Sequence, residues 1–547
     1  MTPRLSVPHV LMLLGALGLV FGNANPLLHL PLVALLYPAA LVLLARESFP
    51  FRRGWICGLA GASASLYWIS WAAHDYGAFP WPLAVPCAVL PGVWVGLWGG
   101  LFCLVLSRFF RMGNAGPLRR ALAAGLLWYL LEWMRGWAAT GFPWLTLGSA
   151  QAPWPLLIQG ASLIGDYGLS GLFAAAACLA AELICSRASS VPMRAGERAG
   201  ALVALMLIVS FVAGYGIWRL KSLPLRDPLA AAGMESSLSL ALVQGNVPQD
   251  IKWEPAFQEH TVDKYLELSV AALAAGEKGA GGVDLVVWPE TAMPFYFQLG
   301  GELPARLREF ARNKGVWLLF GGPARKENFP GGGDFSRDSS LRNRAFLLNP
   351  EGMPESSYDK SHLVPFGEYI PPFLDLPIFE PLLQGVGGFS PGEEGPLPVV
   401  RNGKGDSFRL GMLICYEAIF PEIAREHVAR GADVLINISN DGWYGRSSAP
   451  AQHLYLSVMR AVEQGRWLAR GTNTGLTAVS DPGGRLWLLG GGSPESGSGL
   501  FEDAWLRGSI WPERERSVYF HLHPLLPALA LSLLLLIFFT AKRKQRR

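Results

Sequence analysis

Runs of mainly apolar residues repeat through the first 220 residues of the chain, and one more lies near its end. A membrane-spanning helix needs about 20 mostly apolar residues. The pattern predicts spans at 7–22, 26–44, 54–74, 83–107, 120–138, 167–186, 200–219 and 525–541. The first run is short and is also compatible with a cleaved signal peptide, but no clear cleavage site follows it. We therefore expect eight spans, seven before a large polar region and one after it.

The region between the seventh and eighth runs has a different pattern. Short β-like runs end in turn residues, as in "GGVDLVVWPE" and "FRLGMLICYE", and they alternate with helical stretches such as "FPEIAREHVARG". Strands that alternate with helices are typical of an α/β domain. We expect a membrane domain at 1–222, an α/β domain at 236–512 and a final spanning helix at 524–541.

Composition supports a membrane protein with a polar domain attached. Hydrophobic residues make up 51% of the 547 residues and charged residues only 16%, whereas soluble domains carry about 25% charge. The net charge is +4, and no basic stripe interleaved with aromatics appears. Nucleic acid is therefore not an expected partner.

Positive charge in the loops predicts the orientation. Arginines and lysines gather before the first run, in alternate loops and in the tail: Arg4, Arg46, Arg52, Arg53, Arg108, Arg111, Arg119, Arg120, Arg187, Arg194, Arg198, Lys542, Arg543, Lys544, Arg546 and Arg547. Such residues stay in the cytoplasm. We expect both termini inside and the α/β domain on the outer side of the membrane. Within a run, Glu132 and Arg135 are spaced to pair on one helix face.

Six cysteines occur in the chain, and Cys415 is the one outside the apolar runs. Thiols outside the cytoplasm tend to be oxidised in pairs, and Cys415 has no partner in its own domain. It is either buried and inert or retained for its reactivity. The residues alone leave these two readings about even.

Three polar groups follow strand-like runs in the α/β domain: Glu290, Lys360 and Cys415. Taken singly, Glu290 is more simply an exposed turn acid and Lys360 a surface cation, and Cys415 is as easily a core thiol. Strand ends are where α/β folds place ligands, so the three are also able to converge. A thiolate attacks carbonyls, a carboxylate accepts its proton, and a buried lysine stabilises an oxyanion. Glu368 and Glu417 are further acids that could orient the lysine or move a proton.

Two loops stand out between these groups. Residues 327–343 form a polar loop, and 368–395 are rich in proline, glycine and large apolar residues. An exposed apolar loop suggests a lid or lipid contact, although packing on its own domain is an equally good reading.

The blocks "VVWPET", "YDKSHLVPFGEYIP" and "LICYEAIFPE" resemble the catalytic blocks of the nitrilase superfamily. With "VQGNVPQDIKWEP", "ISNDGWYG", "EWMRGWAATGFPWL" and the apolar runs, the chain resembles its membrane-embedded branch, the apolipoprotein N-acyltransferases. The resemblance implies an αββα sandwich in which Glu290 is the general base, Lys360 the oxyanion stabiliser and Cys415 the nucleophile. Glu368, Trp253, Tyr416 and Glu417 match supporting or substrate-binding positions. Gly471 stands where an alanine is common.

The same resemblance implies the reaction and its partners. An acyl chain passes from a membrane phospholipid, through a cysteine thioester, to the α-amino group of diacylglyceryl-cysteine in bacterial apolipoproteins. It implies the bacterial inner membrane as the location, with the catalytic domain on the periplasmic side, and no cofactor or metal. A membrane-anchored nitrilase-type amidase acting on a small amide is the alternative. A transporter or scaffold is a more distant reading, since charges inside the runs are sparse.

Overall fold

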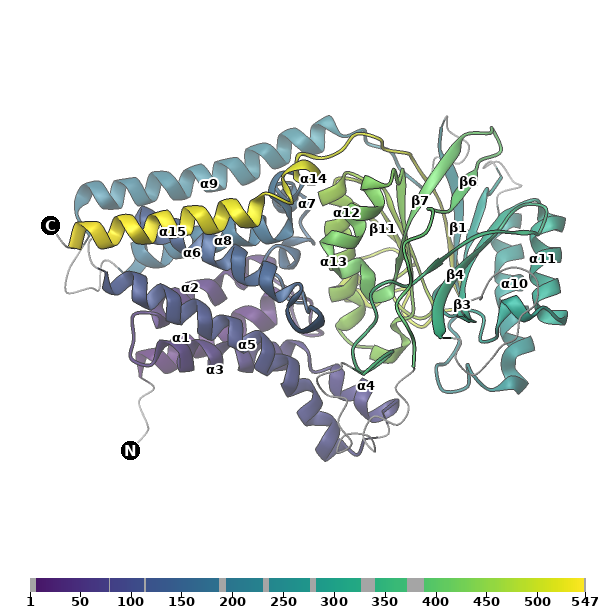
Figure 1. Ribbon diagram of the computed structural model, residues 1–547, viewed down its shortest axis with the longest axis horizontal. Helices are drawn as coiled ribbons and strands as arrows, with labels where there is room; N and C mark the ends of the chain where they lie inside the picture. Colours follow the sequence, from purple (N-terminus) through teal and green to yellow (C-terminus); the bar gives the residue numbers. More distant parts are fainter. Residues whose placement is uncertain are drawn as a thin grey trace. The chain divides into compact units, whose positions relative to one another are not determined.

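The computed structural model describes residues 6–77, 79–112, 115–185, 193–229, 236–275, 282–325, 340–370 and 388–545. It forms two compact units (Figure 1): Met1–Leu223 with Ser447–Glu463 and Ser517–Arg547, and Pro224–Arg446 with Gln464–Arg516. The predicted domain boundaries stay predictions. Of the two loops singled out by sequence, 327–339 and 371–387 lie outside the described residues.

The first unit is helical. Several of its longer helices pack side by side, including α3 against α5, α6 against α8 and α15 against α6. Its helices are α1 (Val7–Gly22), α2 (Leu36–Leu44), α3 (Pro50–Ser65), α4 (Ile69–Asp75), α5 (Trp81–Arg111), α6 (Pro117–Arg135), α7 (Pro155–Ile158), α8 (Ala161–Cys185), α9 (Ala195–Ser222), α13 (Ala449–Gln464), α14 (Val518–Leu522) and α15 (Leu526–Gln545).

The helices only partly follow the predicted spans. Among the described residues, α5, α8 and α9 are long and apolar enough to cross a membrane, and α3 with α4 adds a pair bent by 54°. Shorter apolar helices cover Val7–Gly22, Pro31–Leu44 and Leu526–Thr540. The count of eight spans therefore stays a prediction.

Two predicted spans differ from the helices for local reasons. The run 26–44 is helical only from Pro31, because the Asn25 side chain accepts the backbone N–H groups of Leu27 and Leu28 and closes a turn there. The run 54–74 breaks after Ser65, whose hydroxyl donates to the Gly61 carbonyl at 2.9 Å. Such back-bonding bends helices. Apolar composition therefore predicted the length of these runs but not where the helix within each run begins or breaks.

Two buried acids of the helical unit, Glu132 and Glu182, are paired with arginines. Arg135 Nη2 lies 3.9 Å from Glu132 Oε1, which confirms the predicted pair on α6. Glu132 also accepts a hydrogen bond from Trp128 Nε1 at 2.9 Å. Glu182 of α8 is buried and pairs with Arg46 and with Arg120, the latter at 3.2 Å. These contacts offset the cost of burying charge.

Buried polar contacts explain why α13 groups with the helical unit. Gln452 donates to the Ala24 carbonyl at 2.8 Å and accepts from Trp144 Nε1 at 2.8 Å. Near the end of α13, Glu463 Oε1 accepts the backbone N–H of Asp166 at 2.7 Å. A helix that satisfies buried groups of other helices is fixed to them.

The second unit contains two six-stranded sheets, as far as the described residues extend. The first has the order β12-β1-β2-β3-β4-β5, and the second β11-β10-β9-β8-β7-β6. Strands β1, β2 and β3 run parallel, as do β7, β8 and β9, and the outer strands pair antiparallel. The strands are β1 (Leu238–Gln244), β2 (Leu285–Val287), β3 (Trp317–Arg325), β4 (Leu341–Leu348), β5 (Pro354–Asp359), β6 (Val399–Arg401), β7 (Ser407–Ile414), β8 (Val434–Ser439), β9 (Leu468–Thr472), β10 (Ala478–Ser480), β11 (Leu486–Leu488) and β12 (Ala504–Ile510).

Alternating side chains build the layers of this unit. On β1, Leu240 and Leu242 enter a core shared with β7 and β8, whereas Ala241 and Val243 face a second core. That second core includes residues of α10 (Gln258–Ala274) and α11 (Glu302–Lys314). On the other side, α12 (Pro421–Ala429) packs on β7 (Figure 1). Because strand side chains alternate between faces, these apolar runs fill both layers, and the predicted α/β architecture is confirmed.

Candidate active site

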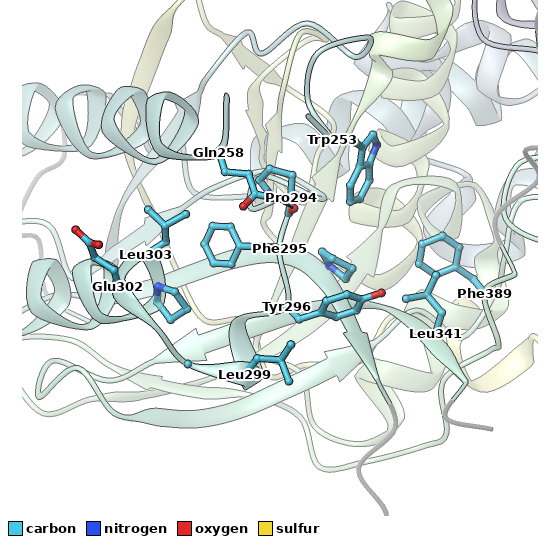
Figure 2. A pocket seen from close by; sticks show the side chains of 13 residues that line it. Trp253, Gln258, Pro294, Phe295, Tyr296, Leu299, Glu302, Leu303, Leu341 and Phe389 are labelled. Atoms are coloured by element: carbon cyan, nitrogen blue, oxygen red, sulfur yellow. Dashed lines mark hydrogen bonds between the residues drawn. The ribbon is translucent and has the colours of Figure 1, made fainter. Parts of the chain in front are cut away.

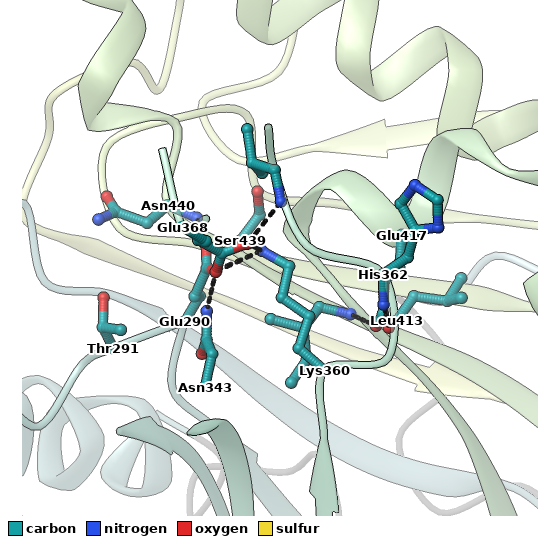
Figure 3. Close-up of polar contacts among 12 residues, drawn as sticks. Glu290, Thr291, Asn343, Lys360, His362, Glu368, Leu413, Glu417, Ser439 and Asn440 are labelled. Carbon is teal, nitrogen blue, oxygen red and sulfur yellow. Dashed lines mark hydrogen bonds and ion pairs between the residues drawn. The ribbon is translucent and has the colours of Figure 1, made fainter. Parts of the chain in front are cut away.

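Ends of three strands bring the sequence-predicted polar groups together. Glu290 lies three residues after β2, Lys360 directly after β5, and Cys415 directly after β7. Lys360 Nζ is 3.1 Å from Glu290 Oε1 (Figure 3). The Cys415 thiol interacts electrostatically with both charges. All three side chains are buried, so the readings as an exposed turn acid and a surface cation are wrong.

A second carboxylate completes the environment of the lysine. Glu368 Oε2 lies 2.9 Å from Lys360 Nζ, and Glu368 Oε1 accepts a hydrogen bond from it at 3.0 Å. Burial acts to lower the pKa of Lys360, but Glu290 and Glu368 outweigh burial and hold this pKa above its usual range. Lys360 is therefore a permanent buried cation. Glu368, predicted as a supporting acid, is in direct contact with it.

Two asparagines that sequence reasoning missed hold these carboxylates. Asn343 of β4 donates to Glu290 Oε1 and to Glu368 Oε1, each at 2.8 Å. The backbone N–H of Asn440 donates to Glu290 Oε2 at 3.0 Å. Asn440 belongs to the "ISNDGWYG" block, which was a usable signal, whereas Asn343 lies in an ordinary strand and gave none. Both oxygens of Glu290 are thus held in a fixed orientation.

Cys415 occupies a sharp turn. It is the first residue of a 3₁₀ helix (Cys415–Ile419), and its φ of 51° lies in the left-handed region. For a non-glycine residue this conformation costs on the order of 1–3 kcal/mol and clusters at functional sites. Burial raises the pKa of the Cys415 thiol, Glu290 raises it further, and Lys360 acts against them. The resting group is a protonated thiol, so nucleophilic attack requires a base.

Glu417 connects the cysteine turn to the lysine loop. Its Oε1 accepts from Tyr358 Oη at 2.9 Å, from Ser361 N and Oγ at 2.6 and 2.7 Å, and from His362 N at 3.1 Å. Its Oε2 accepts the N–H of Ile414 at 2.7 Å. Burial raises the pKa of Glu417, and these donors act against the rise. The carboxylate therefore fixes the segment after Lys360 against the turn that carries Cys415.

Tyr416 packs into the same turn. Its ring is buried and meets Phe420 edge-on with ring centroids 5.1 Å apart, and it lies 5.9 Å from the His362 ring. Burial raises the pKa of Tyr416, with a contribution from Tyr369. The substrate-binding role predicted for Tyr416 and Glu417 stays a prediction, and their contacts in the structure support the turn.

A buried ion pair joins Arg470 of β9 to Asp441, which follows β8, and Asp441 interacts electrostatically with the Cys415 thiol. Arg470 Nη2 contacts Asp441 Oδ2 at 2.7 Å, and Arg470 also donates to Asn437. Asp441 in turn accepts from Ser439 Oγ at 2.9 Å. Asp441 raises the pKa of Cys415, and a hydrogen bond from Ser439 lowers it. The sequence alone gave no reason to expect an arginine buried in this strand.

An apolar cavity of about 490 Å³ adjoins the segments that carry the site. Trp253, 44% exposed, and Tyr296 face the cavity (Figure 2), in the company of Phe295, Leu299, Leu341 and Phe389. Leu341 lies two residues before Asn343 on β4, and the N–H of Phe389 donates to the Glu368 carbonyl at 3.0 Å. Such volumes and linings are typical of small-molecule sites. Trp253 therefore lies where a substrate is able to contact it.

Comparison with known families matches both units. The carbon–nitrogen hydrolase family matches residues 239–496, and the apolipoprotein N-acyltransferase N-terminal domain matches residues 17–179. Together they cover part of the helical unit and most of the unit that contains the two sheets.

Curated relatives match the chain over most of its length. An apolipoprotein N-acyltransferase of Geobacter metallireducens is 38% identical over 84% of this chain and 81% of its own length. That of Azotobacter vinelandii is 36% identical, over 86% of this chain and 85% of its own length. Among solved structures, an amidase of the nitrilase superfamily from Nesterenkonia AN1 aligns with a TM-score of 0.36 and 23% identity, covering 53% of this chain and 95% of that one.

Gly321 on β3 provides the first prediction. A Cβ there would stand 2.5 Å from the N of Thr291 and 2.7 Å from the Cα of Glu290, whereas a Cβ on Gly471 would stand 3.5 Å from Val287. We expect Gly321→Ala to destabilise the protein by about 1–3 kcal/mol through overpacking, and Gly471→Ala to change little. Thermal unfolding of the two detergent-purified variants compares them directly, and equal melting temperatures would contradict the close packing.

Glu417 provides the second prediction. In Glu417→Gln the new NH₂ group replaces one of the two oxygens, and at either position it faces a backbone N–H that needs an acceptor. We therefore expect the free energy of unfolding to fall by about 1–3 kcal/mol. The loosened turn should also alkylate faster at Cys415, measured as the modified fraction of that peptide by mass spectrometry. Glu309→Gln, on an exposed position of α11, is the matched control. Unchanged stability and unchanged alkylation would exclude the bracing role.

Proposed function

The chain belongs to the apolipoprotein N-acyltransferase family, and on this basis we propose that it transfers an acyl chain from a membrane phospholipid to the N-terminal α-amino group of diacylglyceryl-cysteine in bacterial apolipoproteins. The observation that carries the proposal is the buried Glu290–Lys360 pair next to a protonated Cys415 thiol. This set supplies a base, a fixed cation and a nucleophile for acyl transfer.

In the first step Cys415 attacks the ester carbonyl carbon of the phospholipid. Glu290 takes the thiol proton as the C–S bond forms, and the Lys360 ammonium stabilises the oxyanion. The C–O bond then breaks, and Glu290 returns the proton to the leaving lysophospholipid oxygen. The raised pKa of Cys415 supports this order, since the thiol needs a base in contact with the reacting centre.

In the second step the α-amino group of the acceptor attacks the thioester. Glu290 accepts a proton from the amine, the C–S bond breaks, and the sulfur regains the proton. The products are an amide on the lipoprotein and the free thiol. A water molecule in place of the amine would release a fatty acid instead, so the site must exclude water while the thioester exists.

The membrane part fits these substrates. Both are held in the bilayer by acyl chains, and each buried CH₂ contributes about 0.8 kcal/mol to anchoring. Apolar helices long enough to span a membrane keep the enzyme at the same surface. With the charge pattern of the loops, this favours the bacterial inner membrane, cytoplasmic termini and a periplasmic catalytic unit.

The amidase alternative shares the nucleophile but passes the acyl group to water. It is not favoured, because relatives at 36–38% identity over most of the chain are named N-acyltransferases.

Acyl-enzyme formation tests the proposal. After incubation with phospholipid, the intact protein should gain the mass of one acyl chain, and the adduct should map to Cys415 and be released by neutral hydroxylamine. Cys415→Ala should abolish it, and Glu290→Gln should slow it by about 10²–10⁴-fold, the usual contribution of a general base. Cys87→Ala, at a half-buried position of α5, is the control. Hydrolysis of small amides without any lipid adduct would favour the amidase.

The cavity beside Trp253 provides a chain-length prediction. We propose that it holds part of an acyl chain, because its lining is mainly apolar and its walls continue into the segments that hold Glu290 and Glu368. Leu299→Trp should shorten the cavity and cost the burial of a few CH₂ groups, at about 0.8 kcal/mol each. Acylation by a long-chain phospholipid should then slow about tenfold or more, while a short-chain donor is little affected.

The matched control for the cavity is Val270→Trp, on an exposed position of α10 outside it. Rates for long-chain and short-chain donors are compared in single-turnover experiments. Equal slowing of both donors in Leu299→Trp would contradict a chain-binding role.

A further inference from the structure

Lys252 is a second buried lysine beside Glu290. Its side chain is 0% exposed, and Nζ donates a hydrogen bond to Thr291 Oγ1 at 2.8 Å. An ammonium has three donors, and no other hydrogen bond from it is present among the described residues. Burying an ammonium with so little compensation costs far more than burying a neutral amine. The geometry therefore favours an uncharged Lys252.

Thr291 carries this contact to the backbone of the base. It directly follows Glu290 (Figure 3) and has a φ of 46°, a strained value for a β-branched residue. Its backbone N packs so closely on Gly321 that a Cβ added at Gly321 would stand only 2.5 Å from it. A strained turn persists only when its surroundings hold it. The Lys252–Thr291 hydrogen bond is one such restraint, placed one residue from Glu290.

The next residue along the chain from Lys252 is Trp253, which lines the apolar cavity (Figure 2). The same short segment thus supplies a wall of the cavity and a contact to the Glu290 turn. A substrate that contacts Trp253 therefore contacts a segment that is hydrogen-bonded to the residue next to Glu290. Lys252 is therefore placed to fix the position of the cavity wall relative to the Glu290 carboxylate.

The two lysines near Glu290 differ in charge. Burial lowers the pKa of Lys252 to about 7, and Glu290 acts against this. Glu290 is the one charged group that acts on Lys252 within the part of the chain that the structure describes. Lys360, in contrast, has two carboxylates and stays charged. Of these two lysines, Lys252 is the one whose charge changes near neutral pH.

We propose that Lys252 is a positioning residue that holds the Glu290 turn through Thr291 and that supports proton transfer to Glu290 only in its uncharged form. A second ammonium beside Glu290 stabilises the carboxylate as an anion and makes it a poorer proton acceptor. Loss of the Lys252 proton removes that effect. The inference rests on the proposed function, because Glu290 must act as the base.

The sign of the pH dependence follows. Activity should rise as pH increases through about 7, where Lys252 loses its proton, giving an increase of about tenfold between pH 6 and pH 8 from this group alone. Stability should also rise with pH from about 7 to about 10.4, because the unfolded chain still holds the proton there and the folded chain does not.

The test is the single-turnover rate of Cys415 acylation by a short-chain phospholipid across this pH range. In Lys252→Met, which keeps the length of the side chain without charge, the ratio of the rates at pH 8 and pH 6 should fall about tenfold relative to wild type. Lys314→Met, on an exposed position at the end of α11, should keep the wild-type ratio. Melting temperatures at both pH values separate loss of fold from loss of the titration.

A second pair of variants tests the contact itself. Thr291→Ser keeps the hydroxyl and should keep the wild-type rate at pH 8 within about twofold, whereas Thr291→Val keeps the shape and should slow acylation about tenfold, the equivalent of 1.4 kcal/mol. If Lys252→Met does not fold, this pair still tests whether the Lys252–Thr291 hydrogen bond positions Glu290.

The outcomes distinguish this inference from the proposed function. Wild-type protein that forms no acyl-enzyme contradicts the proposed function. Wild-type protein that forms one, with the same ratio of rates in Lys252→Met, overturns the role of the Lys252 charge. Equal rates in Thr291→Val and Thr291→Ser overturn the positioning role.

Discussion

The contact on which the site depends is that of one buried ammonium with two carboxylates, of which Glu290 is buried and Glu368 is half-buried. Lys360 Nζ lies 3.1 Å from Glu290 and 2.9 Å from Glu368. Two acids and one lysine leave an excess negative charge in a low-dielectric interior, which needs further donors. Asn343 and the backbone N–H groups of Asn440 and Val364 supply them. Four separate segments are therefore held together by the requirement to satisfy one small cluster.

Burial, together with the neighbouring charges, determines the resting state of Cys415, the proposed nucleophile. Burial and Glu290 raise the pKa of Cys415 more than Lys360 lowers it, so the resting thiol keeps its proton. Thiolates, rather than thiols, react with oxidants and disulfides. A protonated thiol in a buried turn is thus suited to the oxidising side of the membrane proposed for this unit. The reading that Cys415 is retained for its reactivity stays a prediction.

The sequence was sufficient to predict the polar residues at the ends of strands. It was not sufficient to predict the residues from other segments that contact them. The convergence of Glu290, Lys360 and Cys415 was predictable, because apolar runs ending in polar residues mark strand ends, and strand ends meet in α/β folds. Their roles came from the family resemblance and stay predictions. The contributions of Asn343, Arg470 and Lys252 were not predictable, because each depends on contacts with residues distant in the chain. The spans were predicted from composition, which says nothing of the turn that Asn25 closes or the break after Ser65.

Chemistry and substrate contact share the same short segments, and this coupling has a physical consequence. The chain passes from Glu290 through Thr291 to Phe295 and Tyr296 of the cavity wall, and from Leu341 of that wall to Asn343. Because packed interiors transmit small displacements rather than absorb them, a lipid chain bound in the cavity, as proposed, would displace the same backbone that orients Glu290, the proposed base. Binding energy from an acyl chain far from the ester is then available to align the reacting groups, which is the use of remote binding that raises the rate of the chemical step.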